Sequence, residues 1–446
     1  MSRVLHRSRI APPMALSAKG LRMKLADGRE IIDGSGGAAV ACIGHGDSRV
    51  AEAIGAQAAK LGYAHTGSFT CEPAEALSEH ILDEEPGGLT TAYFCSSGSE
   101  ATEAALKLAR QYFVEIGQKD RTCFIARRQS YHGNTLGALA TGGNMARRAL
   151  YEPILSHAFS HVAPCFPYHF QKPGESDAHY LARLISEIDD EFRRLGPERV
   201  IAFIAEPVVG ATAGCVTAVP GYFRAVRSLC DRYGALLILD EVMCGMGRTG
   251  TQHAWEQEGV SPDIQMVAKG LGGGYQPIGG ILIHRKVVEA IRAGSGAFMH
   301  GHTYQAHPVA CAGALAVQRI IRGDGLLANV RAMGIRLTQA LQERFGNHAH
   351  IGDIRGRGLF QAIELVADRA TRTPFDPALK LHERIRVAAL DHGVAVYPMG
   401  GTIDGAQGDH VLVSPAYTAT AQEIDLIVDR LGEAVFEVLA ALPGAS

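Results

Sequence analysis

One lysine in this chain stands where an apolar segment gives way to glycines. Lys269 follows the apolar segment Ile264 to Ala268 and begins a glycine-rich turn. A lysine is costly at the edge of a hydrophobic core unless the protein uses it. Among apolar groups its pKa falls, and the neutral amine can form an imine with a carbonyl compound. A lysine that extends into solvent is the alternative interpretation. A dinucleotide-binding loop is disfavoured, because Tyr275 breaks the glycine spacing that such a loop requires.

An acidic pair ends a second apolar segment. Leu236 to Leu239 is followed directly by Asp240 and Glu241. Open α/β sheets bind their ligands at the carboxyl ends of the strands, and a carboxylate there could pair with a cationic ring nitrogen. A helix N-cap or a structural ion pair would explain Asp240 equally well at this point.

A third segment changes from an apolar strand to small polar residues and then to a helix. Ser97 and Glu100 have the spacing of a capping box at the helix start. The free backbone N–H groups of such a helix end suit a phosphate, although a plain capped helix would show the same pattern. A Walker-type phosphate loop is disfavoured, because GxxxxGK[ST] occurs nowhere in the chain. Farther on, Tyr131 and His132 place an aromatic ring and an imidazole in one turn.

The elements that carry these residues alternate between strands and helices. From about residue 91 to 283, short apolar runs alternate with longer helical patterns, which predicts a mostly parallel α/β sheet. From about 320, long helices mix with short strands at Gly358 to Glu364, Val394 to Tyr397 and His410 to Val413. Leu21 to Ile32 has the pattern of a hairpin turning at Asp27-Gly28. We expect a large domain at 61–320, a small α+β domain at 321–446, and an N-terminal segment at 1–60 that joins the small domain.

Composition limits the classes of function. The chain has 446 residues, of which 47% are hydrophobic and 20% charged, as in ordinary globular enzymes. The net charge of -3, without a long basic run, argues against nucleic acid as a partner. No apolar run approaches the roughly 20 residues that span a bilayer. The nine cysteines lack a CxxC pair, which favours free thiols in a reducing compartment, and we expect a cytoplasmic protein without a metal site.

Together, these signals correspond to the parts of a pyridoxal 5'-phosphate (PLP) site: a phosphate cradle, an aromatic ring with a histidine, a strand-end aspartate and a strand-end lysine. The chain resembles the class III aminotransferases of PLP fold type I from about residue 20 to 440. The resemblance is carried by the block from Asp240 to Gly250, which contains Asp-Glu-Val and Gly-Arg-Thr-Gly, and by Ala268-Lys269-Gly270.

The resemblance implies roles for the residues around the cofactor ring. Lys269 would hold PLP as a Schiff base, and Asp240 would pair with the pyridine nitrogen. Val242 would pack on one face of the ring and Tyr131 on the other, with His132 beside it.

Further positions match residues that bind the phosphate and flank the substrate pocket. Gly98 and Ser99 match the phosphate-binding pair, and Glu206 matches the acid beside the ring hydroxyl. Thr303 matches a threonine that reaches the phosphate from the second subunit. Because the family builds each site from two chains, the resemblance also implies a homodimer.

Two departures from the family pattern concern the substrate. Many relatives carry a small-domain arginine that binds the acceptor carboxylate, but Tyr397 stands at that place here, and 405–410 contain no arginine either. Near the N-terminus, Gly37 to Val40 replaces the bulky Leu-Trp pair of some amine transaminases, which predicts a roomier pocket. The alternative is that Tyr63, His65 and Phe69 refill this space.

We therefore expect an aminotransferase that moves an amino group from an amine or ω-amino acid to a 2-oxo acid by a ping-pong mechanism. A lyase or phospho-lyase using the same Lys269 is the alternative, and a non-enzymatic PLP carrier or regulatory role is a further one. The sequence alone does not identify the donor or the acceptor.

Overall fold

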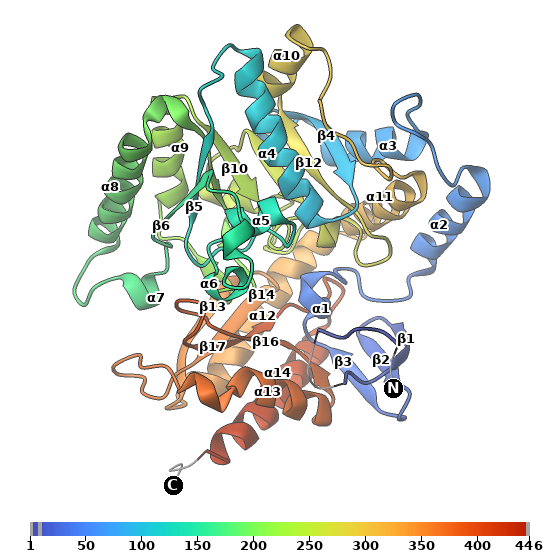
Figure 1. The fold of residues 1–446 in the computed structure, drawn as a ribbon. Coiled ribbons are helices and arrows are strands. Elements are labelled where there is room, and N and C mark those ends of the chain that lie inside the picture. Colours follow the sequence, from blue (N-terminus) through green and yellow to red (C-terminus); the bar gives the residue numbers. More distant parts are fainter. Residues whose placement is uncertain (1–2, 8–10, 443–446) are drawn as a thin grey trace.

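A seven-stranded sheet forms the centre of the molecule (Figure 1). The computed structural model describes residues 3–7 and 11–442. In spatial order the strands are β4 (Leu89–Cys95), β12 (Gly279–His284), β11 (Ile264–Val267), β10 (Leu236–Asp240), β7 (Val200–Ala205), β5 (Cys123–Arg127) and β6 (Phe159–Val162). Only β12 runs antiparallel to its neighbours among these strands, so the prediction of a mostly parallel sheet is confirmed.

Helices cover both faces of this sheet. On one face lie α4 (Gly98–Glu115) and α10 (Arg285–Ala293), and on the other lie α8 (Asp177–Leu195) and α9 (Tyr222–Tyr233). Successive side chains of β10 alternate between the two faces: Leu236 and Ile238 pack with α4, whereas Leu237 and Leu239 pack with α8 and α9. Burial on both faces explains why this strand is continuously apolar in sequence.

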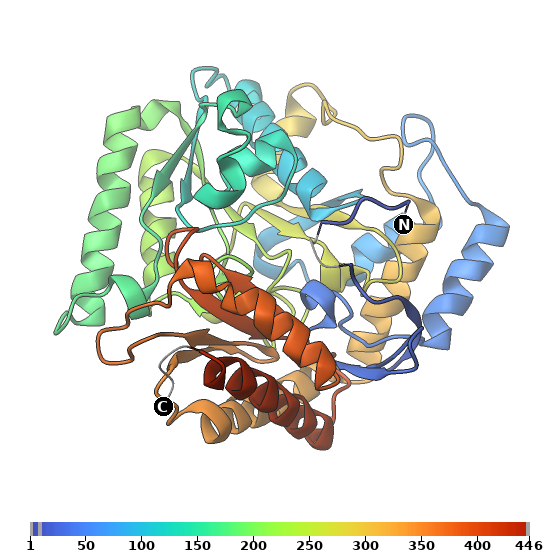
Figure 2. The same cartoon turned by 60° about the horizontal axis from the view of Figure 1, so that its bottom comes forward.

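Two smaller sheets lie together on one side of the large sheet (Figures 1 and 2). One has the order β1 (Ala15–Lys19), β2 (Arg22–Leu25), β3 (Glu30–Asp33), β15 (Val394–Ala395). The other has the order β13 (Ile351–Arg357), β14 (Phe360–Leu365), β17 (Asp409–Val413), β16 (Tyr397–Gly400). The N-terminal hairpin is confirmed by antiparallel pairing of β2 with β3, and this N-terminal segment joins the C-terminal part of the chain where β3 pairs with β15.

Three long helices, α12 (Leu326–Phe345), α13 (Leu381–Asp391) and α14 (Ala421–Ala440), share one hydrophobic core with these smaller sheets. The remaining helices are α1 (Gly36–Ala39), α2 (Ser48–Lys60), α3 (Glu72–Ile81), α5 (Leu136–Thr141), α6 (Met145–Arg148), α7 (Pro167–Phe170) and α11 (Pro308–Gly323), and β8 (Val208–Val209) pairs with β9 (Val216–Thr217). The domain division at residues 60 and 320 stays a prediction, and α11 crosses its second boundary.

One predicted strand is wrong. Val394 to Tyr397 was expected as a single strand, but β15 and β16 belong to different sheets and separate at Val396. Pro398 in β16 has no N–H to donate, which fits its place on the edge strand of its sheet. The predicted strand at Gly358 begins two residues later, because Gly358 lies at φ +53 in the turn before β14.

In the described part of the chain, no helix combines the length and apolar character needed to cross a bilayer. All nine cysteines lie in that part and are unpaired.

The double-sided burial of β10 predicts a large loss of stability on truncation. Leu237 is 0% exposed, so Leu237→Ala should lower the free energy of unfolding by about 2–5 kcal/mol, through lost apolar contacts and the cavity left behind. Urea unfolding followed by circular dichroism measures this. Leu150→Ala is the matched control, since Leu150 is 79% exposed and its truncation should change little. Equal losses in the two variants would contradict this account of the core.

Candidate active site

Three ionisable side chains emerge at one edge of the central sheet. Glu206 follows β7, Asp240 ends β10, and Lys269 lies just beyond β11. The parallel register places Leu239 opposite Ala205 and Asp240 opposite Met266, so the three strands end together. The carboxyl ends of parallel strands are where open α/β sheets bind ligands.

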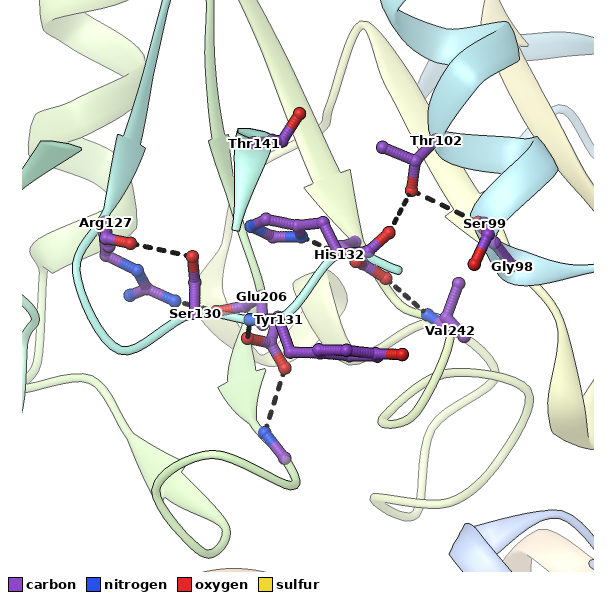
Figure 3. A network of polar contacts seen from close by, with 12 residues as sticks. Gly98, Ser99, Thr102, Arg127, Ser130, Tyr131, His132, Thr141, Glu206 and Val242 are labelled. Atoms are coloured by element: carbon purple, nitrogen blue, oxygen red, sulfur yellow. Dashed lines mark hydrogen bonds and ion pairs between the residues drawn. The ribbon is translucent and has the colours of Figure 1, made fainter. Parts of the chain in front are cut away.

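These side chains line a cavity of about 540 Å³. All of the predicted site residues except Thr303 line it: Gly98, Ser99, Tyr131, His132, Glu206, Asp240, Val242 and Lys269. They come from the start of α4, the turn after β5 and the ends of three neighbouring strands. Figure 3 shows how closely most of them approach one another.

The start of α4 offers free backbone donors to this cavity. Glu100 N donates to Ser97 Oγ at 3.2 Å, so the predicted cap is present, but Glu100 Oε2 accepts from Ser96 N at 2.6 Å rather than from Ser97. In the described part of the chain, the N–H groups of Gly98 and Ser99 have no acceptor. A Cβ atom on Gly98 would come within 2.9 Å of Val242, so only glycine fits beneath that side chain. The helix end therefore has the free donors and the close approach that suit a phosphate group.

Asp240 is buried and held on both carboxylate oxygens. Val242 N donates to Oδ1 at 2.9 Å, and His132 Nδ1 lies 2.7 Å from Oδ2. His132 is itself buried, with Thr102 Oγ1 donating to its carbonyl oxygen at 2.5 Å (Figure 3). Among the described residues, His132 Nε2 has no hydrogen-bond partner. A fixed carboxylate of this kind suits a positively charged ring nitrogen.

Glu206 anchors the segment that carries the aromatic ring. Tyr131 N donates to Oε1 at 3.1 Å and Gly210 N donates to Oε2 at 3.0 Å (Figure 3). Burial raises the pKa of the Glu206 carboxyl, and the nearby Asp240 adds to that shift. The Tyr131 ring extends across the site toward the side where Val242 lies, and both line the cavity.

The surroundings of Lys269 disfavour the charged form of its amine. Its side chain reaches the cavity but is otherwise surrounded by protein, and this burial lowers the pKa of its amine. Asp240 and Glu206 oppose the shift, whereas the charge of Arg147 adds to it. Lys269 also has φ +45, a left-handed conformation that non-glycine residues adopt at a cost. Such strain is concentrated at functional sites, because the surrounding structure must impose it.

Thr303 is not brought to this cavity within its own chain. It is exposed, in a turn that precedes α11. Its position leaves the expected contact with a second subunit as a prediction.

Further residues support the site without having been expected from the sequence. Glu241 accepts hydrogen bonds from Ala254 N, Trp255 N and Gln265 Nε2, at 2.7 to 3.0 Å. Burial raises the pKa of Glu241 to about 8. This network fixes the backbone directly after Asp240. The sequence shows Glu241 directly after Asp240, but it does not show that Glu241 binds residues farther along the chain. Met243 and Gln276 also line the cavity, and no residue-type signal marked them, whereas Val40 belongs to the segment that the sequence analysis placed at the pocket.

Comparison with known proteins agrees with this geometry. The family model for class III aminotransferases matches residues 6–435. An uncharacterised aminotransferase of Schizosaccharomyces pombe is 49% identical over 97% of this chain and 94% of its own length. A diaminobutyrate–2-oxoglutarate transaminase of Halomonas elongata is 36% identical, over 95% of this chain and 90% of its own.

A solved structure supports the fold type. The amine transaminase from an uncultivated Pseudomonas species, in its PLP-bound internal aldimine form, superposes with a TM-score of 0.91 at 33% identity, covering 98% of this chain and 99% of that one. The predicted family and fold are thereby confirmed. The chain belongs to the class III aminotransferases.

Proposed function

We propose that this aminotransferase moves an amino group from an amine or ω-amino acid to a 2-oxo acid, in a ping-pong cycle that depends on a Schiff base at Lys269. The cofactor is PLP. When bound, it supplies an electrophilic carbon for the amine and a ring that accepts electrons. The observation that carries the proposal is that Lys269, with its lowered pKa, is the one lysine among the described residues lining the cavity.

The site residues fit the cofactor group by group. The free N–H groups of Gly98 and Ser99 at the start of α4 would bind the phosphate. Asp240, oriented by His132, would keep the ring nitrogen protonated. Tyr131 and Val242 would pack against the ring.

Lys269 has a second task after the substrate amine replaces it. As a free amine, its Nζ would take a proton from the substrate carbon and deliver a proton to the cofactor carbon that receives the nitrogen. A lowered pKa suits this role, because a larger share of the amine is neutral and able to accept a proton near pH 7.

We also propose a homodimer in which Thr303 completes the partner's phosphate site, and a cytoplasmic location. Exposure of Thr303 in the single chain supports the first proposal. Nine unpaired cysteines support a reducing compartment.

Lys269→Ala should give a folded protein that cannot bond PLP covalently, because no other lysine lines the described cavity. Borohydride reduction followed by peptide mapping detects the bond, with Lys286→Ala on α10 as the control that keeps it. A phosphopyridoxyl label on another lysine of the unaltered protein would overturn the assignment.

Asp240→Asn should fold and bind PLP but transfer amino groups several orders of magnitude more slowly. The amide can still meet His132 but carries no charge to hold a proton on the ring nitrogen. A comparable Asp→Asn change in a serine protease costs about 10⁴ in turnover. Single-turnover absorbance, followed from the aldehyde to the amine form of the cofactor, measures the rate. A variant that keeps more than about a tenth of the rate contradicts the role, since the transfer rate would then have fallen by less than about a factor of ten. In the unaltered protein, regeneration of the aldehyde form with release of product would indicate a lyase instead.

Thr303→Ala should weaken PLP binding about 5- to 30-fold, the scale of one lost hydrogen bond to a charged group. The decisive test mixes Thr303→Ala subunits with Lys269→Ala subunits. If the threonine acts across the interface, one site of each mixed dimer carries both changes and the other carries neither, so half of the sites recover normal affinity. Thr122→Ala, another exposed threonine, is the control. Failure of every mixed dimer to recover a normal site would place Thr303 in its own chain's site.

A further inference from the structure

Charged residues of both signs lie beyond the cavity, where Tyr397 takes the place of the small-domain arginine. One further hollow shares Val40 and Gly274 with the active-site cavity, and a second hollow continues from the first. Arg7, Arg386 and Tyr397 line both hollows. Two of the acids that also line them are engaged by histidines: Asp33 Oδ2 lies 3.1 Å from His45 Nε2, and Asp409 Oδ1 lies 2.5 Å from His382 Nδ1. Lys380 and Glu383 add one charge of each sign, so the charges that line these hollows do not by themselves select an anion.

Among the described residues, Arg147 is a cation whose charge acts on Lys269. Its guanidinium carbon lies 4.6 Å from the centroid of the Tyr131 ring, over the ring face. Its charge acts on both Tyr131 and Lys269. Arg147 is half-buried, and within residues 3–7 and 11–442 no carboxylate or carbonyl accepts a hydrogen bond from its side chain.

The next residue along α6 shows how differently the same side chain can be used. Arg148 is 8% exposed, pairs with Glu152 at 3.0 Å, and donates to the carbonyl oxygens of Ala140 and Gly142 at 2.7 and 2.8 Å. The guanidinium of Arg148 therefore has its ion-pair and hydrogen-bond partners inside the fold. Arg147 has only an aromatic ring beneath it, so its hydrogen-bond donors are left for a ligand.

We propose that Arg147 binds a carboxylate of the substrate, one carried several atoms from the reacting amine, and so replaces the small-domain arginine whose place Tyr397 takes. This inference rests on the proposed aminotransferase function and specifies its donor as an ω-amino acid. The guanidinium fork matches a carboxylate through two parallel hydrogen bonds.

The stacking on Tyr131 explains why the carboxylate must be distal. Tyr131 lines the cavity and Arg147 does not, so the aromatic ring separates the guanidinium from the atoms next to Lys269. A carboxylate on the reacting carbon would stay on the inner side of that ring, whereas one at the far end of an alkyl chain can extend past it. The cation–π contact also holds Arg147 in place before the substrate arrives, which reduces the entropy lost on binding.

A binding experiment tests the inference without turnover. Pentanoate and pentanamide have the same shape and differ in charge, and calorimetry gives their affinities for the PLP-loaded enzyme. The unaltered enzyme should bind pentanoate about 10- to 100-fold more tightly, as expected for hydrogen bonds between charged groups. Arg147→Gln should remove most of this preference, and Arg147→Lys, which keeps the charge without the fork, should keep part of it.

Matched donors give a second readout. In the half-reaction, Arg147→Gln should reduce kcat/KM for 5-aminopentanoate about 10- to 100-fold, mainly through KM, and for pentylamine less than about 3-fold. Arg292→Gln, an exposed arginine on α10, is the control and should alter neither reaction.

Each outcome separates the two proposals. Equal affinities for pentanoate and pentanamide, or equal losses for both donors in Arg147→Gln, overturn the assignment of Arg147 while leaving the transaminase function intact. If the unaltered enzyme takes an amino group from neither donor nor from any other amine, the proposed function fails, and the binding comparison still decides the role of Arg147.

Discussion

The common end of three parallel strands is the constraint on which the site depends. β7, β10 and β11 pair in parallel, so Glu206, Asp240 and Lys269 leave the sheet at the same edge. A shift of one residue in any strand would turn its side chains to the opposite face. The apolar residues of β10 prevent such a shift, because each face packs against its own layer of helices. The hydrophobic core therefore fixes the position of the charged groups at its edge.

Bringing ionisable groups together at the edge of a core has a desolvation cost, and the structure offsets it with specific donors. Asp240 accepts from Val242 N and meets His132, while Glu206 accepts from Tyr131 N and Gly210 N. These bonds also orient the groups that they stabilise: Glu206 positions the backbone of Tyr131, and Asp240 positions the imidazole beside it. The amine of Lys269 has no comparable hydrogen-bond partners among the described residues, and burial lowers its pKa.

The residues predictable from sequence are those on or directly after regular elements. Lys269 and Asp240 end apolar strands, and Gly98 begins a capped helix, so local patterns locate them. Predicting that they meet in one cavity required the family resemblance, because local sequence patterns do not determine the order of strands in a sheet. Val394 to Tyr397 was misleading, because its two halves pair in separate sheets. Gln276 and Met243 line the cavity only through tertiary packing.

Arg147 shows a further limit of sequence patterns. Arg147 and Arg148 are adjacent and identical in type, and α6 is a short helix with no strong periodicity. Within this single helical turn, the Arg148 side chain points toward the carbonyl oxygens of Ala140 and Gly142, and the Arg147 side chain points toward the Tyr131 ring. Chemical type alone cannot separate a structural arginine from one that is free to bind a ligand. The separation depends on which hydrogen-bond donors the fold has already used. The strand ends therefore determine where the ionisable groups of the cavity meet, and the proposed role of Arg147 depends on donors that the fold leaves unused.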